Sequence, residues 1–319
     1  LTRSSAASDV YKRQIKDLLM DPENYDFRPL PDSDLVDTGV IVDAITDGFI
    51  GDAPDQGAYE YGGEMWVPGI SWDISEVFGD EFSEPEPMYN GTLFHVSING
   101  SNNNDGSIDN PFSSIQFAYD RADEQDTILV HPGVYYDDIW FYGKNVVLGS
   151  LYLTTGDASF ISSTIIDGDS TDCTIAIYGN IDSTCRITGF TIQNGIGCVY
   201  GQGAGIYVES ASPRLDNLII KNNISGTNGG GICLNGNSNS LIDKVLINNN
   251  FADAGGGLYS FNSNPVITNS IIQNNHANNG AGVFLELCSP NFENVSITGN
   301  AATSFGGGSV SYTHLTLPT

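Results

Sequence analysis

The sequence predicts an all-β fold, a parallel β-helix in which short strands wind into stacked coils. Three observations predict it. Glycine-rich triplets recur along the second half of the chain, and their third residues are 26, 26, 25 and 26 positions apart. The residues after most triplets alternate with period two, as in strands. One asparagine follows at the same phase in four units. The triplets are Gly203-Ala204-Gly205, Gly229-Gly230-Gly231, Gly255-Gly256-Gly257, Gly280-Ala281-Gly282 and Gly306-Gly307-Gly308, and the asparagines are Asn223, Asn250, Asn275 and Asn300.

The repeat length explains why these strands must stack. A short strand with one apolar face cannot bury that face alone, whereas coils repeated at a spacing of about 4.8 Å form parallel sheets around a narrow core. An isoleucine stands three residues before each repeated asparagine and suits this core. Helical repeats are a poor alternative, because a glycine triplet in each unit and prolines in most would break the helices. The asparagines in register predict ladders of side-chain amides at the turns.

Composition limits the classes of partner. The 319 residues carry 39 acidic and 11 basic side chains, which gives a formal net charge of −28. Such a polyanion is repelled by nucleic acid and by anionic membrane surfaces, so we expect neither as a partner. No run approaches ~18 apolar residues, so we also expect no membrane span in this sequence.

The start of the repeat region has its own pattern. The segment Leu93 to Asp137, together with IIDGD (165–169) and ITGFTIQNG (187–195), resembles secreted bacterial right-handed parallel β-helix proteins of the pectate-lyase-like superfamily. The resemblance implies a strand, a polar loop, a capping helix and a first coil. Ser113 or Ser114 is a suitable N-cap for a helix that reaches about Ala122. The later coils are similar to the repeats of bacterial polymorphic outer-membrane proteins, which are surface adhesins.

Resemblances also divide the chain. DFRPLPDSDLVDTG (26–39) and GDAPDQGAYEYGG (51–63) are similar to the closing segment of such β-helices, and both ends of the chain are similar to translated sequencing adapter. We therefore expect an artefact over 1–14, the C-terminal tail of an upstream β-helix domain over 15–63, an acidic linker over 64–90, a truncated parallel β-helix over 91–308, and an artefact over 309–319.

Cysteine and acidic residues suggest little dedicated chemistry. The five cysteines have no metal-site spacing, so buried free thiols are expected, and a Cys173–Cys185 bridge is the open alternative. Ca²⁺ is the one cofactor that the acidic loops suggest, although Asx-rich turns are the favoured explanation of each loop. These loops are 102–109, Asp167 with Asp169 and Asp172, and Asp52 with Asp55.

Two columns of outward side chains follow the glycine triplets. Residues at equal phase in a stack form columns about 4.8 Å apart. Aromatic rings among carboxylates suit carbohydrate, because rings stack on sugar faces and polar groups bind hydroxyls; an aromatic ladder that stabilises the sheet is the structural alternative. The predicted carbohydrate-binding residues are Tyr207, Glu209, Tyr259, Phe261, Phe284 and Glu286, with Cys233 and Asn235 in the same columns.

A second outward region offers a catalytic alternative. Polysaccharide lyases of the resembled superfamily hold Ca²⁺ with carboxylates and use a base such as arginine, which implies Asp216 and Asp243 as metal ligands and Arg214 as the base. Carboxylates about 5 Å apart also suit a retaining glycosidase. Arg186 shares the phase of Arg214. Surface ion pairs explain the same residues, and the sequence signatures of polygalacturonases are absent.

These observations favour a secreted or cell-surface module that binds carbohydrate or mediates adhesion without catalysis. Its partner is expected to be a polysaccharide, a surface glycan or a protein. A Ca²⁺-dependent polysaccharide lyase or glycoside hydrolase is the first alternative, and a structural stalk is the second. Whether the chain is an enzyme stays open at this point.

Overall fold

The structure is a computed structural model, and it describes residues 19–21, 26–30, 36, 92–198 and 201–312. Contacts divide the chain into two units, Leu1–Pro68 and Gly69–Thr319. In the first unit the described residues contain an antiparallel pair, β1 (Leu19–Asp21) with β2 (Asp26–Pro29). The segments predicted as an N-terminal artefact (1–14) and as a linker (64–90), and most of the predicted tail (15–63), lie outside the described residues.

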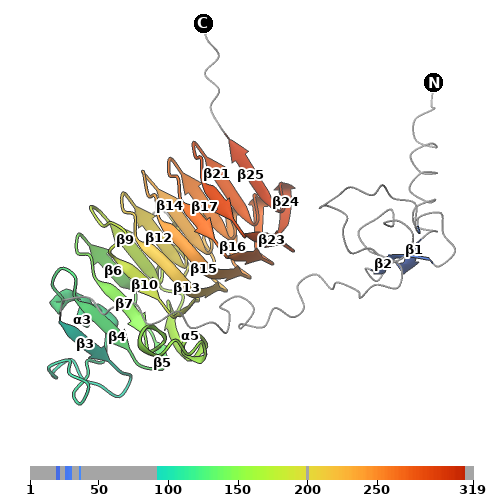
Figure 1. The fold of residues 1–319 in the computed structure, drawn as a ribbon. Coiled ribbons are helices and arrows are strands. Elements are labelled where there is room, and N and C mark those ends of the chain that lie inside the picture. The colour runs from blue at the N-terminus through green and yellow to red at the C-terminus, as the bar shows by residue number, and fades with distance from the viewer. Residues whose placement is uncertain (1–18, 22–25, 31–35, 37–91, 199–200, 313–319) are drawn as a thin grey trace, which may run out of the picture. The chain divides into compact units, whose positions relative to one another are not determined.

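The described part of the second unit is a stack of parallel strands, which confirms the predicted all-β solenoid (Figure 1). Each coil turns through faces that pair only with the same faces of neighbouring coils. The seven-stranded sheet is made of β6 (Ile139–Tyr142), β9 (Ile175–Tyr178), β12 (Ile206–Glu209), β14 (Ile232–Asn235), β17 (Leu258–Phe261), β21 (Val283–Glu286) and β25 (Ser309–Tyr312). The three-stranded sheet is made of β16 (Phe251–Ala254), β20 (His276–Asn279) and β24 (Ala301–Phe305).

The largest sheet has 13 strands in two arms, which are joined by the long strands β13 (Arg214–Lys221) and β15 (Leu241–Asn248). Residues with positive φ, Asn217 at 53° and Lys244 at 52°, lie inside these strands where one arm passes into the other. One arm contains β3 (Leu93–Val96), β4 (Thr127–Val130), β7 (Val147–Ser150), β10 (Arg186–Thr188), β18 (Val266–Thr268) and β22 (Asn291–Glu293). The other contains β5 (Gly133–Tyr135), β8 (Thr164–Asp167), β11 (Thr191–Gln193), β19 (Ile271–Gln273) and β23 (Ser296–Thr298).

A helix covers the first coils, as the sequence predicted. The helix is α3 (Ile115–Arg121), and its N-cap is Ser114. The Ser114 side-chain oxygen accepts a hydrogen bond from the Phe117 N–H. Ile115, Ala118 and Tyr119 are buried, and α3 contacts β3, β4 and β6 (Figure 1).

Two short helices, α4 (Tyr152–Thr155) and α5 (Ser159–Ser163), lie between β7 and β8 and have no counterpart in the repeat pattern. Among the described residues, no helix is long and apolar enough to cross a membrane.

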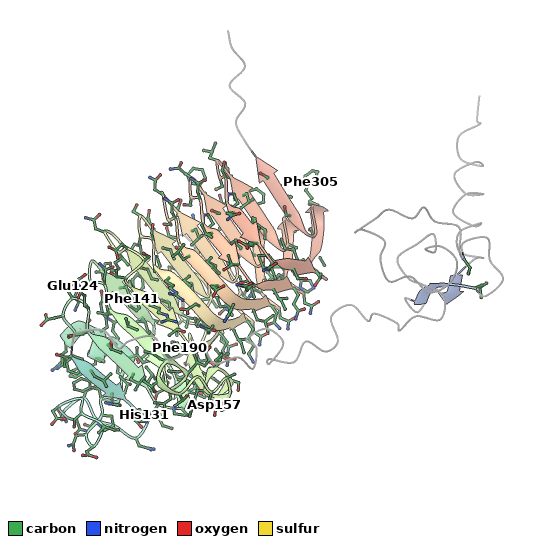
Figure 2. The ribbon with its side chains drawn as sticks, in the orientation of Figure 1. Glu124, His131, Phe141, Asp157, Phe190 and Phe305 are labelled. Carbon is green, nitrogen blue, oxygen red and sulfur yellow. A yellow bond between two sulfur atoms is a disulfide. The ribbon has the colours of Figure 1, made fainter. Side chains whose placement is uncertain are left out.

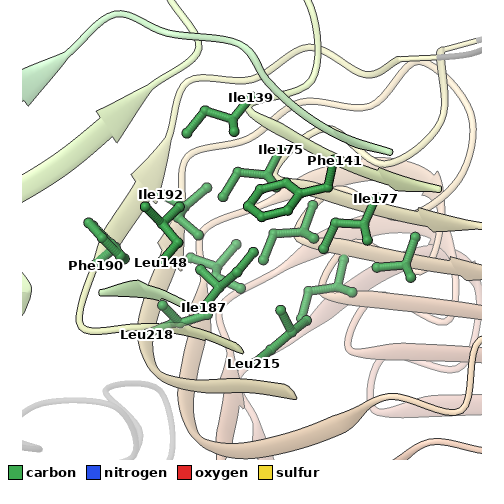
Figure 3. Close-up of a cluster of buried hydrophobic side chains, with 14 of the residues drawn as sticks. Ile139, Phe141, Leu148, Ile175, Ile177, Ile187, Phe190, Ile192, Leu215 and Leu218 are labelled. Carbon is green, nitrogen blue, oxygen red and sulfur yellow. The ribbon is translucent and has the colours of Figure 1, made fainter. Parts of the chain in front are cut away.

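The core is a continuous column of inward-facing aliphatic and aromatic side chains (Figure 3). Ile175 and Ile177 of β9 lie beside Phe141 of β6, and Ile187 and Leu215 approach them from the opposite sheet (Figure 3). The predicted isoleucine column is in register from Ile220 through Ile247 and Ile272 to Ile297. Burial of this column supplies the driving force that short single strands lack.

Buried asparagines join the coils at the corner after β13, β15 and β19. The Asn250 side-chain oxygen accepts from the backbone N–H and from the side-chain amide of Asn223, each at 3.0 Å. The Asn250 amide donates to the Ile220 carbonyl and to the Asn275 side-chain oxygen, each at 3.0 Å. Asn275 and Asn300 repeat the pattern, so the predicted amide ladder is confirmed.

The glycine triplets lie where neighbouring coils come closest. A Cβ at Gly230 would lie 2.5 Å from the Gly256 carbonyl oxygen of the next coil, and one at Gly231 would lie 2.6 Å from that of Gly257. Only glycine fits such an approach. The excess of glycine therefore belongs to tight stacking and is not a property of flexible linkers.

Candidate functional site

The outer face of the seven-stranded sheet carries two columns of side chains, as predicted. Pairing puts Tyr207, Cys233, Tyr259 and Phe284 at equal phase, and Glu209, Asn235, Phe261 and Glu286 at the next outward phase. The same register runs upstream through β9 and β6. It adds Ala176 and Trp140 to the first outward column, and Tyr178 and Tyr142 to the second outward column.

Three of these added side chains form a cluster of near-parallel rings, the ring triad of Trp140, Tyr142 and Tyr178. Their ring centroids lie 5.3 to 6.2 Å apart, and their planes differ by 8° to 13°. Tyr142 is 58% exposed, and Trp140 and Tyr178 are half-buried. Such spacings are typical of favourable aromatic pairs. Sequence reasoning missed the triad because the glycine triplets that fixed the phase begin only at Gly203.

The polar edges of the ring triad differ in their surroundings. The Trp140 indole N–H and the Tyr142 hydroxyl have no protein partner among the described residues and are not buried. The Tyr178 hydroxyl is buried without a hydrogen-bond partner in the same part of the chain. Burial first, and then the neighbouring Tyr207 and Tyr142 hydroxyls and the Glu209 carboxylate, raise the pKa of Tyr178.

The two predicted tyrosines are less accessible than the sequence suggested. Tyr207 is 2% and Tyr259 is 7% exposed, and both belong to a small apolar cluster outside the main core. Their hydroxyls lie 3.2 Å from a Glu209 oxygen and 3.1 Å from a Glu286 oxygen. Burial raises the pKa of Tyr207 to about 12, so its hydroxyl stays a donor at neutral pH. These rings cannot stack on a ligand, but they fix the positions of two carboxylates.

The remaining predicted residues line the half-buried part of this face. Phe284 stacks on Tyr259 with centroids 5.5 Å apart and planes 15° apart. Phe261 lies between Asn235 and Glu286 in the second outward column. Glu209, Phe261, Phe284 and Glu286 are all partly accessible. The face therefore combines hydrogen-bonding groups with rings, and its most exposed rings lie at the N-terminal coils.

Of the predicted catalytic residues, Asp216 lies in a buried ion pair, and its closest partner is Arg186, which was not among them. Asp216 is fully buried and accepts two hydrogen bonds from the Arg186 Nε, at 2.9 and 3.2 Å, and one from its terminal nitrogen at 2.6 Å. Arg214 lies 3.5 Å from the same carboxylate, and the Asn217 amide donates to it at 2.9 Å. Asp216 thus has its lone pairs occupied by protein donors. Sequence reasoning placed Arg186 in phase but did not identify it as the partner.

Asp243 is in register with Asp216 but has other partners. It accepts from the Thr268 hydroxyl at 2.5 Å and from the Asn269 amide at 2.8 Å. The two carboxylates therefore lie in neighbouring coils, as predicted, while each is held by donors of its own. Nothing in these contacts leaves an open pair of carboxylates for a metal ion.

Two of the acidic loops contain Asx turns. In loop 102–109 the Asp105 side chain accepts from the Ser107 N–H at 3.0 Å, while Asn102 accepts from the more distant Ser113 and Ser114 N–H groups, at 3.1 and 3.2 Å. Asp167 accepts from the Asp169 N–H at 3.0 Å and from the Gln193 and Asn194 amides at 2.8 Å each. Asp172 accepts from the Cys173 N–H at 2.8 Å. The predicted pair Asp52 and Asp55 lies outside the described residues.

The cysteine prediction is corrected by a disulfide between Cys173 and Cys198. Neither residue is a free thiol, and the alternative Cys173–Cys185 bridge is not formed. Cys185, Cys233 and Cys288 are buried free thiols, as expected. Burial raises the pKa of Cys185 to about 12. Asp172 lies near the disulfide sulfurs, but bonded sulfurs are not thiolate ligands for a metal.

Comparison with known proteins supports the fold. A family model described as right handed beta helix region matches residues 149–316, which is more than half of the chain. The match supplies the handedness of the coil, which strand pairing alone leaves open. No curated protein in the comparison matches the chain.

Proposed function

Because the chain belongs to the family of right handed beta helix regions, we propose that it is a non-catalytic module that binds carbohydrate or mediates adhesion. The binding surface is the outer face of the seven-stranded sheet. The ring triad contacts the sugar directly, together with the half-exposed Glu209, Phe261, Phe284 and Glu286. Tyr207 and Tyr259 act as positioning residues that hold the two glutamates.

The observation that carries the proposal is the ring triad, in which Tyr142 is exposed and Trp140 and Tyr178 are half-buried. A sugar ring has an apolar face of C–H groups and a rim of hydroxyls. Near-parallel rings offer a matching apolar surface, and a few polar groups at its edge fix the orientation of a ligand. The Trp140 indole N–H and the Tyr142 hydroxyl supply such groups without breaking a hydrogen bond within the described residues.

Charge selects the class of glycan. With a net charge of −28, the chain repels polyuronates and other anionic polymers unless cations bridge them. A neutral glycan is not repelled by this negative charge. The disulfide supports a secreted or cell-surface location, because disulfides persist in oxidising compartments. A protein partner would have to bind the same mixed aromatic and acidic face.

The test is a glycan array probed with the full chain and with a Trp140→Ala/Tyr142→Ala variant. We expect neutral glycans to bind the wild-type chain and to lose at least about tenfold in affinity in the variant, since two large apolar contacts are removed. Tyr136→Ala is the matched control, because Tyr136 is 68% exposed and lies outside both columns.

Three results would count against the proposal. A wild-type chain that binds no glycan would favour the structural stalk. Binding that survives the double substitution would remove the site from this face. Cleavage of a polysaccharide that depends on Arg214 and Asp243 would favour the enzyme instead, and an ultraviolet assay for unsaturated products detects the lyase form.

A further inference from the structure

We propose that a hollow beside the three-stranded sheet is a second binding site for a single neutral sugar residue. The hollow has a volume of about 520 Å³, within the usual range for ligand sites. None of its lining residues lies on the seven-stranded sheet, so the proposal goes beyond the surface described above. The lining residues are Asn222, Ile224, Asn249, Asn250, Phe251 and His276.

The stacking of coils brings the apolar part of the hollow together. Ile224 pairs with Phe251 in an isolated bridge, and Phe251 pairs with His276 where β16 lies beside β20. The three side chains therefore stand at equal phase in three successive coils. Ile224 is 57% and Phe251 is 53% exposed, so a ring face and an aliphatic branch are open to a ligand.

The polar part comes from the asparagine corners. Asn222 and Asn249 have positive φ values of 58° and 54°, and their side chains are exposed. Neither amide has a hydrogen-bond partner among the described residues. Each amide offers a donor and an acceptor, which is the combination that sugar hydroxyls need. Asn250 lines the bottom of the hollow but offers no hydrogen bond to a ligand, because its side-chain amide and oxygen are bonded within the buried ladder.

The chemistry of the lining favours an uncharged sugar over other occupants. The six lining residues include no carboxylate, ammonium or guanidinium group, so nothing there compensates a charged ligand. The strongly negative chain disfavours anions further. An apolar ring flanked by amides and an imidazole matches one pyranose: Phe251 contacts its C–H face, and Asn222, Asn249 and His276 bind its hydroxyls.

The experiment follows the His276 ring protons by NMR in the full chain. The probes are the linear neutral tetrasaccharides of β-1,4-glucan, β-1,4-mannan and β-1,4-xylan, with tetragalacturonate as the anionic comparison. A His276→Gln variant assigns the signals. We expect at least one neutral probe to shift these signals and tetragalacturonate to leave them unmoved. Phe251→Ala should weaken that titration about tenfold or more.

Phe305→Ala is the matched control. Phe305 is also an exposed phenylalanine of the three-stranded sheet, at 64% exposure, and it lies outside the hollow near the C-terminal end of the stack (Figure 2). We expect this variant to titrate like the wild type. An Asn249→Ala variant should weaken binding as well, because it removes a hydroxyl partner and leaves Phe251 in place.

The outcomes separate this site from the proposed function. His276 signals that no neutral probe moves, or an equal titration in Phe251→Ala and Phe305→Ala, would overturn the second site. Loss of the His276 shift in Trp140→Ala/Tyr142→Ala would also overturn it, because the two sites share no residue. If the His276 shift is absent while sugar still changes a tryptophan fluorescence signal that the Trp140→Ala/Tyr142→Ala variant lacks, only the second site fails.

Discussion

Replacing Asn250 by alanine should destabilise the stack more than any exposed asparagine can. Asn250 is fully buried, and its side chain makes four hydrogen bonds to three residues of neighbouring coils. Alanine removes all four and introduces no new partner. The substitution therefore tests whether the amide ladder stabilises the stack of coils, or whether the apolar core alone supplies the stability at this corner.

The magnitude follows from the groups left without partners. The Asn223 side-chain amide keeps the Ile192 carbonyl at 3.3 Å, and the Asn275 side-chain oxygen keeps the Asn250 N–H at 2.9 Å. The Asn223 backbone N–H is left without a partner, and the Ile220 carbonyl, which lies within the ladder of β13 and β15, loses one bond. An unsatisfied buried group costs about 1–3 kcal/mol and a lost hydrogen bond costs about 1 kcal/mol, so together they predict a loss of about 3 kcal/mol. That is a large share of the roughly 5–15 kcal/mol of a typical domain.

The assay is urea unfolding followed by far-ultraviolet circular dichroism. Asn291→Ala is the matched control, because Asn291 is an exposed strand residue whose side chain makes no hydrogen bond within the described residues. We expect the control to lie within about 0.5 kcal/mol of wild type. Asn250→Asp, which keeps the acceptor oxygen but loses the donor, should be destabilised at neutral pH at least as strongly as Asn250→Ala.

A loss below about 1 kcal/mol in Asn250→Ala would refute the reasoning, since it would mean that water or a relaxed backbone satisfies the buried Asn223 N–H at little cost. Equal losses in Asn250→Ala and Asn291→Ala would refute it as well. Native-state hydrogen exchange gives an independent check, because the Asn223 N–H should lose protection first.

Two further predictions concern titration and an unpartnered hydroxyl. Tyr178→Phe should leave stability unchanged or raise it by up to about 1 kcal/mol, because the hydroxyl is buried without a partner; a loss above that size in urea unfolding would show that the hydroxyl is satisfied. His95 and His131 lie 3.0 Å apart, and burial lowers the pKa of both below 6.5. The unfolded chain therefore binds more protons than the folded chain just below pH 6.5, so stability should be full above that pH and fall as the pH drops through it. Unfolding midpoints at pH 7.5 and 5.5 measure the loss, and a His95→Gln/His131→Gln variant that keeps the full pH difference would contradict the assignment.

The sequence predicted features that repeat, because every coil must meet the same packing conditions. The column from Tyr207 to Phe284 and the ladder from Asn223 to Asn300 are both in the predicted register. The N-cap was predicted as Ser113 or Ser114, since capping depends on local chemistry, and the structure shows that it is Ser114. Periodicity is thus a reliable guide to which residues share a face.

Features that occur once were not predictable in this way. The Cys173–Cys198 bridge spans 25 residues that include β9, β10 and β11, but the other coils have no matching pair of cysteines, so no repeated column marked it in the sequence. Tyr207 and Tyr259 are outward in phase, yet neighbouring side chains and the preceding turns cover them, as the close approach of Gly255 to Tyr259 illustrates. The position of a residue in the repeat predicts to which face of the sheet its side chain points. Its exposure to solvent depends on which neighbouring side chains and turns pack over that side chain.

The disulfide also has a mechanical consequence. Hydrogen bonds between coils run along the stack, so a force applied along that axis would separate the ladders one coil at a time. A released coil of about 25 residues would lengthen the chain by roughly 85 Å. The Cys173–Cys198 cross-link spans 25 residues and withholds one such length from extension. In single-molecule pulling, this additional extension should appear only after the disulfide has been reduced. An equal total extension with and without reductant would contradict the prediction.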